Sequence, residues 1–362
     1  MNRILAVDIL RGYFIFVIII DHLGRFPGLF ELFTGKGQLW VSAAEGFFFV
    51  SGMMIGLVRG KRALNKPFRQ VAKKILSRAW VLYIWSVVLT LGFTAVGIML
   101  SGHEGVKPGL TASRDYIQIF RDTLSLNYAY GWTDFLALYV KFMVFAPVAI
   151  WLLRKNMWYL VLAASGYIWY QSGIAHDQGW QILFFGGTIL GYYLDKIEST
   201  VLGWKKYWQR LWLYAIYGLT IGSLIVSIYA VHGRTVLETM NMSVPNWLVE
   251  SQAVINQTFG AHFERISLQL PRLAMFCLWF AALYVLTRRY ETLIINKTKD
   301  FFTLFGQNSL YVFIMQGIVI FFVDLFLPRG NQFIFNVLIN TCGLMFFYTI
   351  TKREILFKVV PR

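Results

Sequence analysis

The stretch from Ile4 to Leu23, ILAVDILRGYFIFVIIIDHL, decides the fold class. It is a continuous apolar run of the length that a helix needs to cross a hydrocarbon layer about 30 Å thick. A transmembrane β-barrel would need alternating segments of about ten residues, which this run does not resemble. Nine further runs follow, at about 39–58, 79–100, 132–153, 157–175, 180–195, 211–231, 267–287, 303–327 and 333–351. The sequence therefore predicts an all-α, polytopic integral membrane protein of about ten transmembrane helices, built as one domain over residues 1–362 around a polar central cavity.

The composition excludes several other classes of protein. Of the residues, 57% are hydrophobic and 14% are charged, against about 25% charged in a soluble domain. Cys277 and Cys342 both lie in apolar runs, which excludes a secreted disulfide scaffold. The net charge of +16 lies in the short connections and not on a polar domain, so we expect no nucleic-acid partner. Asp8 and Arg11 within the first run, with no small-residue cleavage site after it, argue against a cleavable signal peptide.

The basic connections predict the orientation in the membrane. Residues 59–78 contain eight Lys or Arg and no acidic residue, which is typical of a cytoplasmic connection. Counting spans from there places the N-terminus and, for an even number of spans, the C-terminus in the cytoplasm. The longer connections 101–131 and 232–266 then lie outside. Residues 59–78 could alternatively form a basic amphipathic helix on the membrane surface. The other connections predicted inside also contain basic pairs or triplets, at 154–155, 205–210, 288–289 and 352–358.

Ionisable residues inside the first run need an explanation, because each costs a few kcal/mol near the bilayer centre. This run contains Asp8, Arg11, Asp21 and His22. Asp8 and Arg11 are three residues apart and could neutralise each other. Arg11 and His22 are eleven residues apart, hence nearly in line on one helix face and about 16 Å apart along its axis. They predict a polar stripe between the two membrane faces, although His22 alone could be an interfacial histidine.

The second run contains Glu45 within the segment 44–52, AEGFFFVSG. A carboxylate so far from either end of the run should pair with a cation or keep its proton. Gly46 and Gly52 would allow another helix to approach closely. Further ionisable residues in or beside the runs are Arg78, Asp134, Lys141, Arg272 and Asp324. For Lys141 and Asp324 a structural ion pair or an interfacial position is as good an interpretation as a function.

Motifs of soluble enzymes are missing from the sequence: we find no Walker loop, dinucleotide fingerprint, nucleophile elbow or metal-binding Cys/His spacing. We therefore expect no metal. An enzyme built on this chain would have to use a buried histidine with acidic and arginine partners. A near-neutral imidazole suits general-base catalysis on a hydroxyl group, and His22 is the candidate.

Two of these segments resemble a known superfamily. Arg11 and His22, separated by ten residues, resemble the arginine-x10-histidine motif of the acyltransferase-3 membrane acyltransferases. The segment 45–52, EGFFFVSG, is similar to that superfamily's acidic-x-Phe-Phe-x-x-Ser-Gly signature, in which the acidic residue is usually Asp. Gln316 stands where relatives often have a second histidine. Further segments resemble the OpgC-type succinyltransferases of osmoregulated periplasmic glucans, namely 21–22 (DH), 134–140 (DFLALYV) with 146–147 (AP), 180–184 (WQILF) and 305–313 (FGQNSLYVF).

The resemblance implies an acyl-coenzyme A donor, either succinyl- or acetyl-coenzyme A, bound on the cytoplasmic side of a bacterial inner membrane. The acceptor would be a hydroxyl of an extracytoplasmic glycan. The basic segment 59–78 offers cations for coenzyme A, although cytoplasmic orientation alone explains many of them. The site residues expected on this basis are His22 as base, Asp21 or Asp134 to orient it, Arg11, Lys74 and Arg78 for phosphates or the acyl carbonyl, Glu45 paired with one of these arginines, and Arg272 for a succinyl carboxylate.

Other functions remain open at this stage. A transporter or flippase could use the same buried charges as a substrate or proton path, although the sequence lacks paired inverted repeats with broken helices. A scaffold or receptor would explain the spans but not four ionisable groups in one of them. The sequence does not distinguish direct transfer from an acyl-histidine intermediate. It also leaves open the acyl group, the glycan and whether the chain forms a homo-oligomer.

Overall fold

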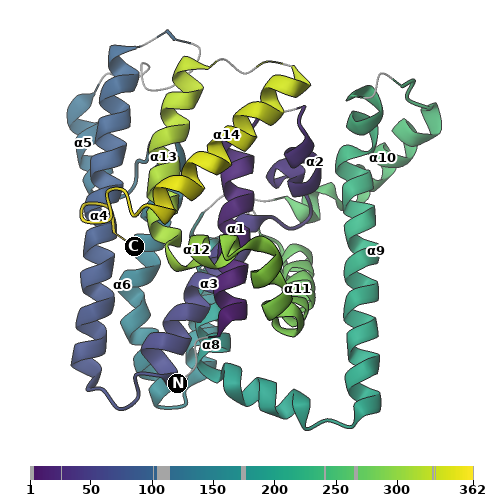
Figure 1. The fold of residues 1–362 in the computed structure, drawn as a ribbon. Coiled ribbons are helices and arrows are strands. Elements are labelled where there is room, and N and C mark those ends of the chain that lie inside the picture. The colour runs from purple at the N-terminus through teal and green to yellow at the C-terminus, as the bar shows by residue number, and fades with distance from the viewer. Residues whose placement is uncertain are drawn as a thin grey trace.

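The computed structural model describes residues 4–25, 27–100, 102–103, 115–172, 177–239, 242–264, 268–327, 330 and 332–361. Within these ranges every regular element is a helix, which confirms the all-α prediction (Figure 1). The α-helices are α1 (Leu5–Leu23), α2 (Leu29–Thr34), α3 (Ala43–Met54), α4 (Phe68–Met99), α5 (Tyr116–Leu124), α6 (Asp134–Arg154), α7 (Trp158–Gln171), α8 (Gln181–Leu202), α9 (Lys206–Thr239), α10 (Asn246–Phe259), α11 (Leu270–Thr298), α12 (Phe301–Gln307), α13 (Ser309–Phe326) and α14 (Phe333–Lys352).

Seven helices of the described part are long and apolar enough to cross a membrane. They are α3 with its π-helical continuation Ile55–Lys61, α4, α6, α9, α11, α13 and α14. The other three predicted spans correspond to α1, α7 and α8. These three helices are not among the seven because α1 and α8 contain too many charged residues and α7 has only 14 residues. The protein is therefore a membrane protein, and the count of ten spans and the orientation remain predictions.

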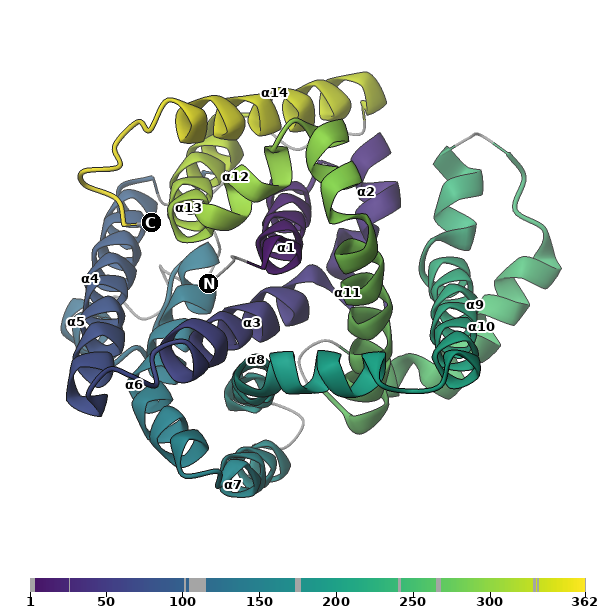
Figure 2. The same ribbon diagram turned by 60° about the horizontal axis from the view of Figure 1, so that its bottom comes forward.

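Helix α1 lies at the centre of the bundle, between α3, α11, α12 and α13 (Figure 2). Its backbone touches that of α12, because a Cβ atom at Gly12 would lie 1.8 Å from the carbonyl oxygen of Phe302. Helices α3 and α8 approach as closely, since a Cβ at Gly52 would lie 1.8 Å from the carbonyl oxygen of Phe184. Small residues allow such contacts between membrane helices, and the role predicted for Gly52 is confirmed.

Three boundaries differ from the prediction. The apolar run 303–327 divides at Asn308 into α12 and α13, so the helix axis changes direction there (Figure 1). Residues 68–78 are not a separate surface helix, because they form the first turns of α4. The connections 101–131 and 232–266 contain α5 and α10, and α9 extends to Thr239. Hydropathy misplaced the ends of α4 and α9 because polar turns continue these apolar helices without a break, and it missed the division at Asn308 because both helices there are apolar.

Several basic connections lie at one end of the bundle, which we call the basic end. The guanidinium of Arg154 donates hydrogen bonds to the carbonyls of Ala63 (2.6 Å) and Lys66 (3.1 Å). Arg62, Arg288 and the first residues of α1 line one cavity of about 560 Å³. Helix α1 therefore runs from the basic end, at Leu5, to His22 near its other end. Three of the connections predicted to be cytoplasmic, at 59–78, 154–155 and 288–289, thus share one side of the molecule.

Candidate active site

His22 lies in the last turn of α1, where it is half-buried and faces α13. A neighbour of its imidazole is Gln316, whose side-chain nitrogen lies 3.5 Å from His22 Nδ1. Gln316 is fully buried, and its Oε1 has no hydrogen-bond partner among the described residues. A half-turn of the Gln316 amide would exchange its oxygen and its nitrogen. Gln316 Oε1 would then accept the proton on His22 Nδ1, and His22 Nε2 would be the basic nitrogen of the imidazole. The uncharged residue at position 316 therefore contacts the candidate base.

The two carboxylates expected to orient His22 lie on different elements. Asp21 accepts a hydrogen bond from the hydroxyl of Thr34 (2.6 Å), which ends α2. Adjacent residues of a helix point in different directions, so the side chain of Asp21 faces α2 while that of His22 faces α13. The contact with Thr34 holds α2 next to this end of α1. Asp134 is exposed at the start of α6 and accepts the backbone N–H of Phe135 (2.6 Å). The orienting role of either carboxylate remains a prediction.

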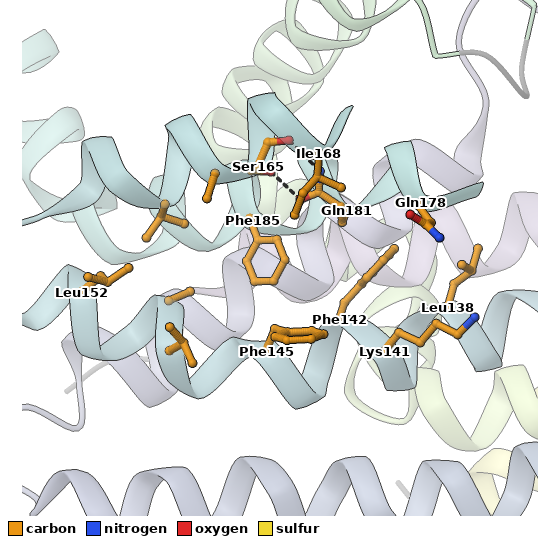
Figure 3. Close-up of a pocket in the computed structure, with 14 residues that line it drawn as sticks. Leu138, Lys141, Phe142, Phe145, Leu152, Ser165, Ile168, Gln178, Gln181 and Phe185 are labelled. Carbon is orange, nitrogen blue, oxygen red and sulfur yellow. Dashed lines mark hydrogen bonds between the residues drawn. The ribbon is translucent and has the colours of Figure 1, made fainter. Parts of the chain in front are cut away.

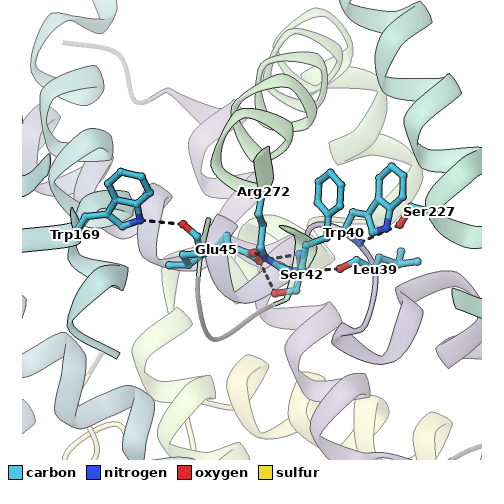
Figure 4. A network of polar contacts seen from close by, with 9 residues as sticks. Leu39, Trp40, Ser42, Glu45, Trp169, Ser227 and Arg272 are labelled. Carbon is cyan, nitrogen blue, oxygen red and sulfur yellow. Dashed lines mark hydrogen bonds and ion pairs between the residues drawn. The ribbon is translucent and has the colours of Figure 1, made fainter. Parts of the chain in front are cut away.

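Glu45 is held by a buried ion pair that connects α3 to α11 (Figure 4). Its Oε1 lies 2.5 Å from Arg272 Nε, and both side chains are at most 1% exposed. Its Oε2 accepts the backbone N–H (2.7 Å) and the hydroxyl (2.5 Å) of Ser42, which closes a capping box at the start of α3. The predicted pairing of Glu45 with Arg11 or Arg78 is therefore wrong, because the paired cation is Arg272. Glu45 is placed to fix helix geometry, since both oxygens already have donors.

The guanidinium of Arg272 is also occupied by contacts within the protein. Its Nη1 donates to the carbonyls of Phe263 (2.5 Å) and Leu39 (3.4 Å), in addition to the pair with Glu45. These contacts attach α11 to the two segments that precede α3 and α11 (Figure 4). Its Nη2 has no partner among the described residues. The expectation that Arg272 binds a succinyl carboxylate stays a prediction, and it would have to use this nitrogen.

Sequence reasoning missed two buried charged residues near the His22 end of α1. Arg25 is 1% exposed and donates to the carbonyls of Val323 (3.3 Å) and Leu327 (2.7 Å), where a cation stabilises the C-terminus of α13. It also lies 3.8 Å from Asp324, so the structural ion pair left open for Asp324 is present. Glu31 is fully buried and accepts a hydrogen bond from Asn340 of α14 (2.6 Å).

Burial raises the pKa of Glu31 above its ordinary value of 4.5, and outweighs the hydrogen bond from Asn340, which acts in the opposite direction. Arg25 and Glu31 lie in the polar connection between the first two apolar runs. Hydropathy assigns such a connection to the surface, so no signal in the single sequence marks them. Tertiary packing buries them: Arg25 lies against the end of α13, and Glu31 lies between α2 and α14.

The basic end contains a cleft of about 520 Å³ between α4 and the start of α13. Lys74 and Arg78 lie four residues apart on α4, so they share one face of the helix. Arg59, from the π-helical end of α3, and Lys73 join them. The remaining lining residues are Gln70, Ser77, Val81, Leu310 and Pro361. No described residue that lines the cleft is acidic, so the cleft suits a polyanion.

Helix α13 connects this basic cleft to His22. Leu310, in its first turn, lines the cleft, and Gln316, six residues later, contacts the imidazole. Six residues of α-helix correspond to about 9 Å along the axis. Arg11 lies half-buried on α1 and is not among the described residues that line the cleft. The structure thus brings Lys74 and Arg78 together as predicted, and leaves the role of Arg11 as a prediction.

Comparison with known proteins identifies one family. The family model described as OpgC protein matches residues 3–356, which includes all of the helices from α1 to α14. No curated protein matches the chain, and no solved structure matches it. The match covers the surroundings of His22 and every residue that lines the basic cleft except Pro361, so the family relationship concerns the whole bundle and not a single motif.

Proposed function

The chain belongs to the OpgC family, which indicates a glucan-modifying, acyltransferase-like function, and from this premise we propose that it transfers an acyl group from acyl-coenzyme A to a hydroxyl of an extracytoplasmic glycan. The observation that carries the proposal is the arrangement along α13. A cleft lined by four cations lies at its start, and the candidate base lies against the same helix about two turns later.

The donor occupies the basic cleft through its phosphates. Arg59, Lys73, Lys74 and Arg78 supply cations from two helices, and arginine is suited to bidentate contacts with phosphate. The pantetheine arm then follows α13 toward Gln316 and presents the thioester to His22. This arrangement needs only the arm, and not the whole cofactor, to enter the bundle. Succinyl- and acetyl-coenzyme A share the phosphates and the arm, so the cleft accepts either donor.

The proposed chemistry is general-base catalysis at His22. The basic imidazole nitrogen takes the proton of a sugar hydroxyl while that oxygen attacks the thioester carbonyl carbon. The new carbon–oxygen bond forms, the carbon–sulfur bond breaks, and the thiolate leaves with the proton returned by the imidazolium. Gln316 holds the imidazole in the required tautomer once its amide is turned, so that the carbonyl oxygen takes the place of the nitrogen that now faces His22 Nδ1. The negative charge of Asp21 or Asp134 stabilises the imidazolium by electrostatic attraction.

In this proposal the membrane separates the two substrates. The basic end lies in the cytoplasm, where acyl-coenzyme A is made, and the His22 end of α1 opens to the outside, where the glycan is. The shared position of the basic connections around Arg62 and Arg154 supports this orientation. The bacterial inner membrane is the compartment that offers both substrates.

The test uses purified protein in detergent with succinyl- or acetyl-coenzyme A, an added glucan, and a colorimetric measurement of free thiol. We expect thiol release that depends on the glucan and is abolished in His22→Ala. His262→Ala is the matched control, because His262 is an exposed histidine that contacts Gln269 and should leave the rate unchanged. Thermal unfolding shows whether each variant is folded. A folded protein that releases no thiol with either donor would favour transport instead.

A further inference from the structure

Helices α6, α7 and α8 enclose a cavity of about 450 Å³, which we call the lateral groove (Figure 3). Aromatic and aliphatic side chains form most of its wall, among them Phe142, Phe145, Leu152, Ile168 and Phe185. It is formed by different helices from the basic cleft, and none of the described residues assigned to catalysis lines it. The apolar wall excludes a sugar or a nucleotide as the occupant and suits a hydrocarbon chain.

One charged residue interrupts this apolar wall. Lys141 lies in the second turn of α6, and its ammonium group points along the helix toward Leu138, beside Gln178 (Figure 3). None of the ion pairs among the described residues includes Lys141, so the structural pair left open by the sequence is not seen in this part of the chain. A lysine within a membrane span is costly when no anion accompanies it, so a ligand that brings an anion to Lys141 is favoured.

The neighbouring polar residues do not compensate this charge. Gln181 and Ser165 satisfy each other, because the Ser165 hydroxyl donates to the Gln181 carbonyl oxygen (2.5 Å) and the Gln181 amide donates to the Ser165 carbonyl (2.7 Å). The groove therefore combines one uncompensated cation with a long apolar wall. That combination selects a ligand with an anionic head and a hydrocarbon tail.

We propose that the lateral groove binds one anionic glycerophospholipid, with its phosphate on Lys141 and one acyl chain along α6 toward Leu152. The two residues are eleven positions apart, or about 16 Å along the helix. One acyl chain covers about half of a hydrocarbon core about 30 Å thick, so a single chain is long enough to fill the lateral groove. The lipid enters from the Asp134 end of α6, which is the outer side in the orientation proposed above, and its acyl chain reaches past the bilayer midplane toward Leu152. A neutral lipid fills the groove equally but leaves Lys141 without an anion.

The bound lipid would also hold α7 in place. Among the described residues of α7, only Val161 and Ser165 are buried, so this helix has little protein contact of its own. An acyl chain between α6 and α7 adds apolar contact to both. Lipid binding should therefore raise the thermal stability of the protein, because a ligand that binds only the folded state stabilises it.

The test is native mass spectrometry of the full chain in detergent, titrated with dioleoyl phosphatidylglycerol or dioleoyl phosphatidylcholine. We expect one phosphatidylglycerol to bind the wild type about fivefold more tightly than phosphatidylcholine, the difference expected for one lysine. Lys141→Gln should remove this preference and Lys141→Arg should keep it. Lys155→Gln is the matched control, because Lys155 lies beyond α6 with its ammonium over the Trp151 ring, outside the groove.

A second variant tests the groove without changing a charge. Ala164→Trp places a large side chain in the groove and should abolish binding of both lipids, even if Lys141→Gln fails to fold. Added phosphatidylglycerol should raise the unfolding temperature of the wild type and of Lys155→Gln, but not of Ala164→Trp. Equal affinity for the two lipids in the wild type, or unchanged binding in a folded Ala164→Trp, would overturn the proposal. Both outcomes are independent of acyl transfer.

Discussion

Two groups of cations in this bundle differ in what surrounds them. Arg272 and Arg25 are at most 1% exposed, and each is in contact with an acidic side chain and with backbone carbonyls. Lys74 and Arg78 line an open cleft in which no described residue is acidic. A buried cation must be paired inside the protein, whereas cations gathered around a cleft without acids create a positive potential that a ligand can use. The comparison predicts that the first group determines stability and the second determines substrate binding.

The largest effect should come from breaking the buried pair. Arg272→Leu leaves the Glu45 carboxylate buried without its cation, and we expect a loss of about 3–5 kcal/mol in the free energy of unfolding. Urea unfolding in detergent, followed by circular dichroism, measures this loss.

The double variant Glu45→Leu with Arg272→Leu is its control, because it removes both charges. We expect it to recover much of the lost stability, since paired apolar side chains can replace a buried ion pair. If the loss in the double variant equalled the sum of the losses in Arg272→Leu and in the single variant Glu45→Leu, the two residues would act independently.

The next effect should be on substrate affinity at the basic cleft. Lys74→Gln and Arg78→Gln each remove one charged contact with phosphate, so we expect the KM for acyl-coenzyme A to rise about tenfold, with kcat nearly unchanged. Initial rates at varied donor concentration measure both constants.

Lys66→Gln is the matched control, since Lys66 is an exposed lysine of the same basic segment that does not line the cleft. The unfolding free energy of all three variants should stay within about 0.5 kcal/mol of the wild type. An unchanged KM in Arg78→Gln would remove the cleft from donor binding.

A smaller effect, on kcat, is expected at Gln316, which is fully buried and contacts the candidate base His22. Gln316→Leu removes the amide beside His22 Nδ1, so we expect kcat to fall several-fold while the KM for acyl-coenzyme A stays constant. Gln316→His restores a hydrogen-bonding group and should recover most of kcat. A loss confined to thermal stability, with kcat preserved in Gln316→Leu, would mean that the residue only packs.

The smallest effect concerns pH and Glu31, a buried acid of α2 whose pKa is raised by burial. Because its pKa is raised in the folded state, its contribution to stability is fully present below its ordinary pKa of 4.5 and is lost as the pH rises through the raised value. Glu31→Gln cannot ionise, so its unfolding temperature relative to wild type should increase as the pH rises from 4.5. Unfolding scans of both proteins across this range measure the difference, and a constant difference would contradict the assignment.

The sequence predicted much of the fold and part of the site. Apolar runs identified the helices because hydrophobic length is a local property. The basic segment gave Lys74 and Arg78 because both lie on one face of one helix. The partner of Glu45 could not be found in this way, since Arg272 is 227 residues distant. Gln316 was noticed only as a departure from the resembled family, and its contact with His22 depends on how α13 packs against α1.

The sequence by itself determined that this protein is a helical membrane protein, that its cations concentrate in short connections, and that His22 is the candidate base. Only the tertiary structure decided which charges are paired with buried acids and which line a cleft. Hydropathy and residue spacing act along one helix, whereas the pairing of a charge depends on atoms contributed by helices far apart in the chain. Lys141 shows the difference: its position in a span was evident from the sequence, and the apolar groove beside it exists only because α7 and α8 pack against α6.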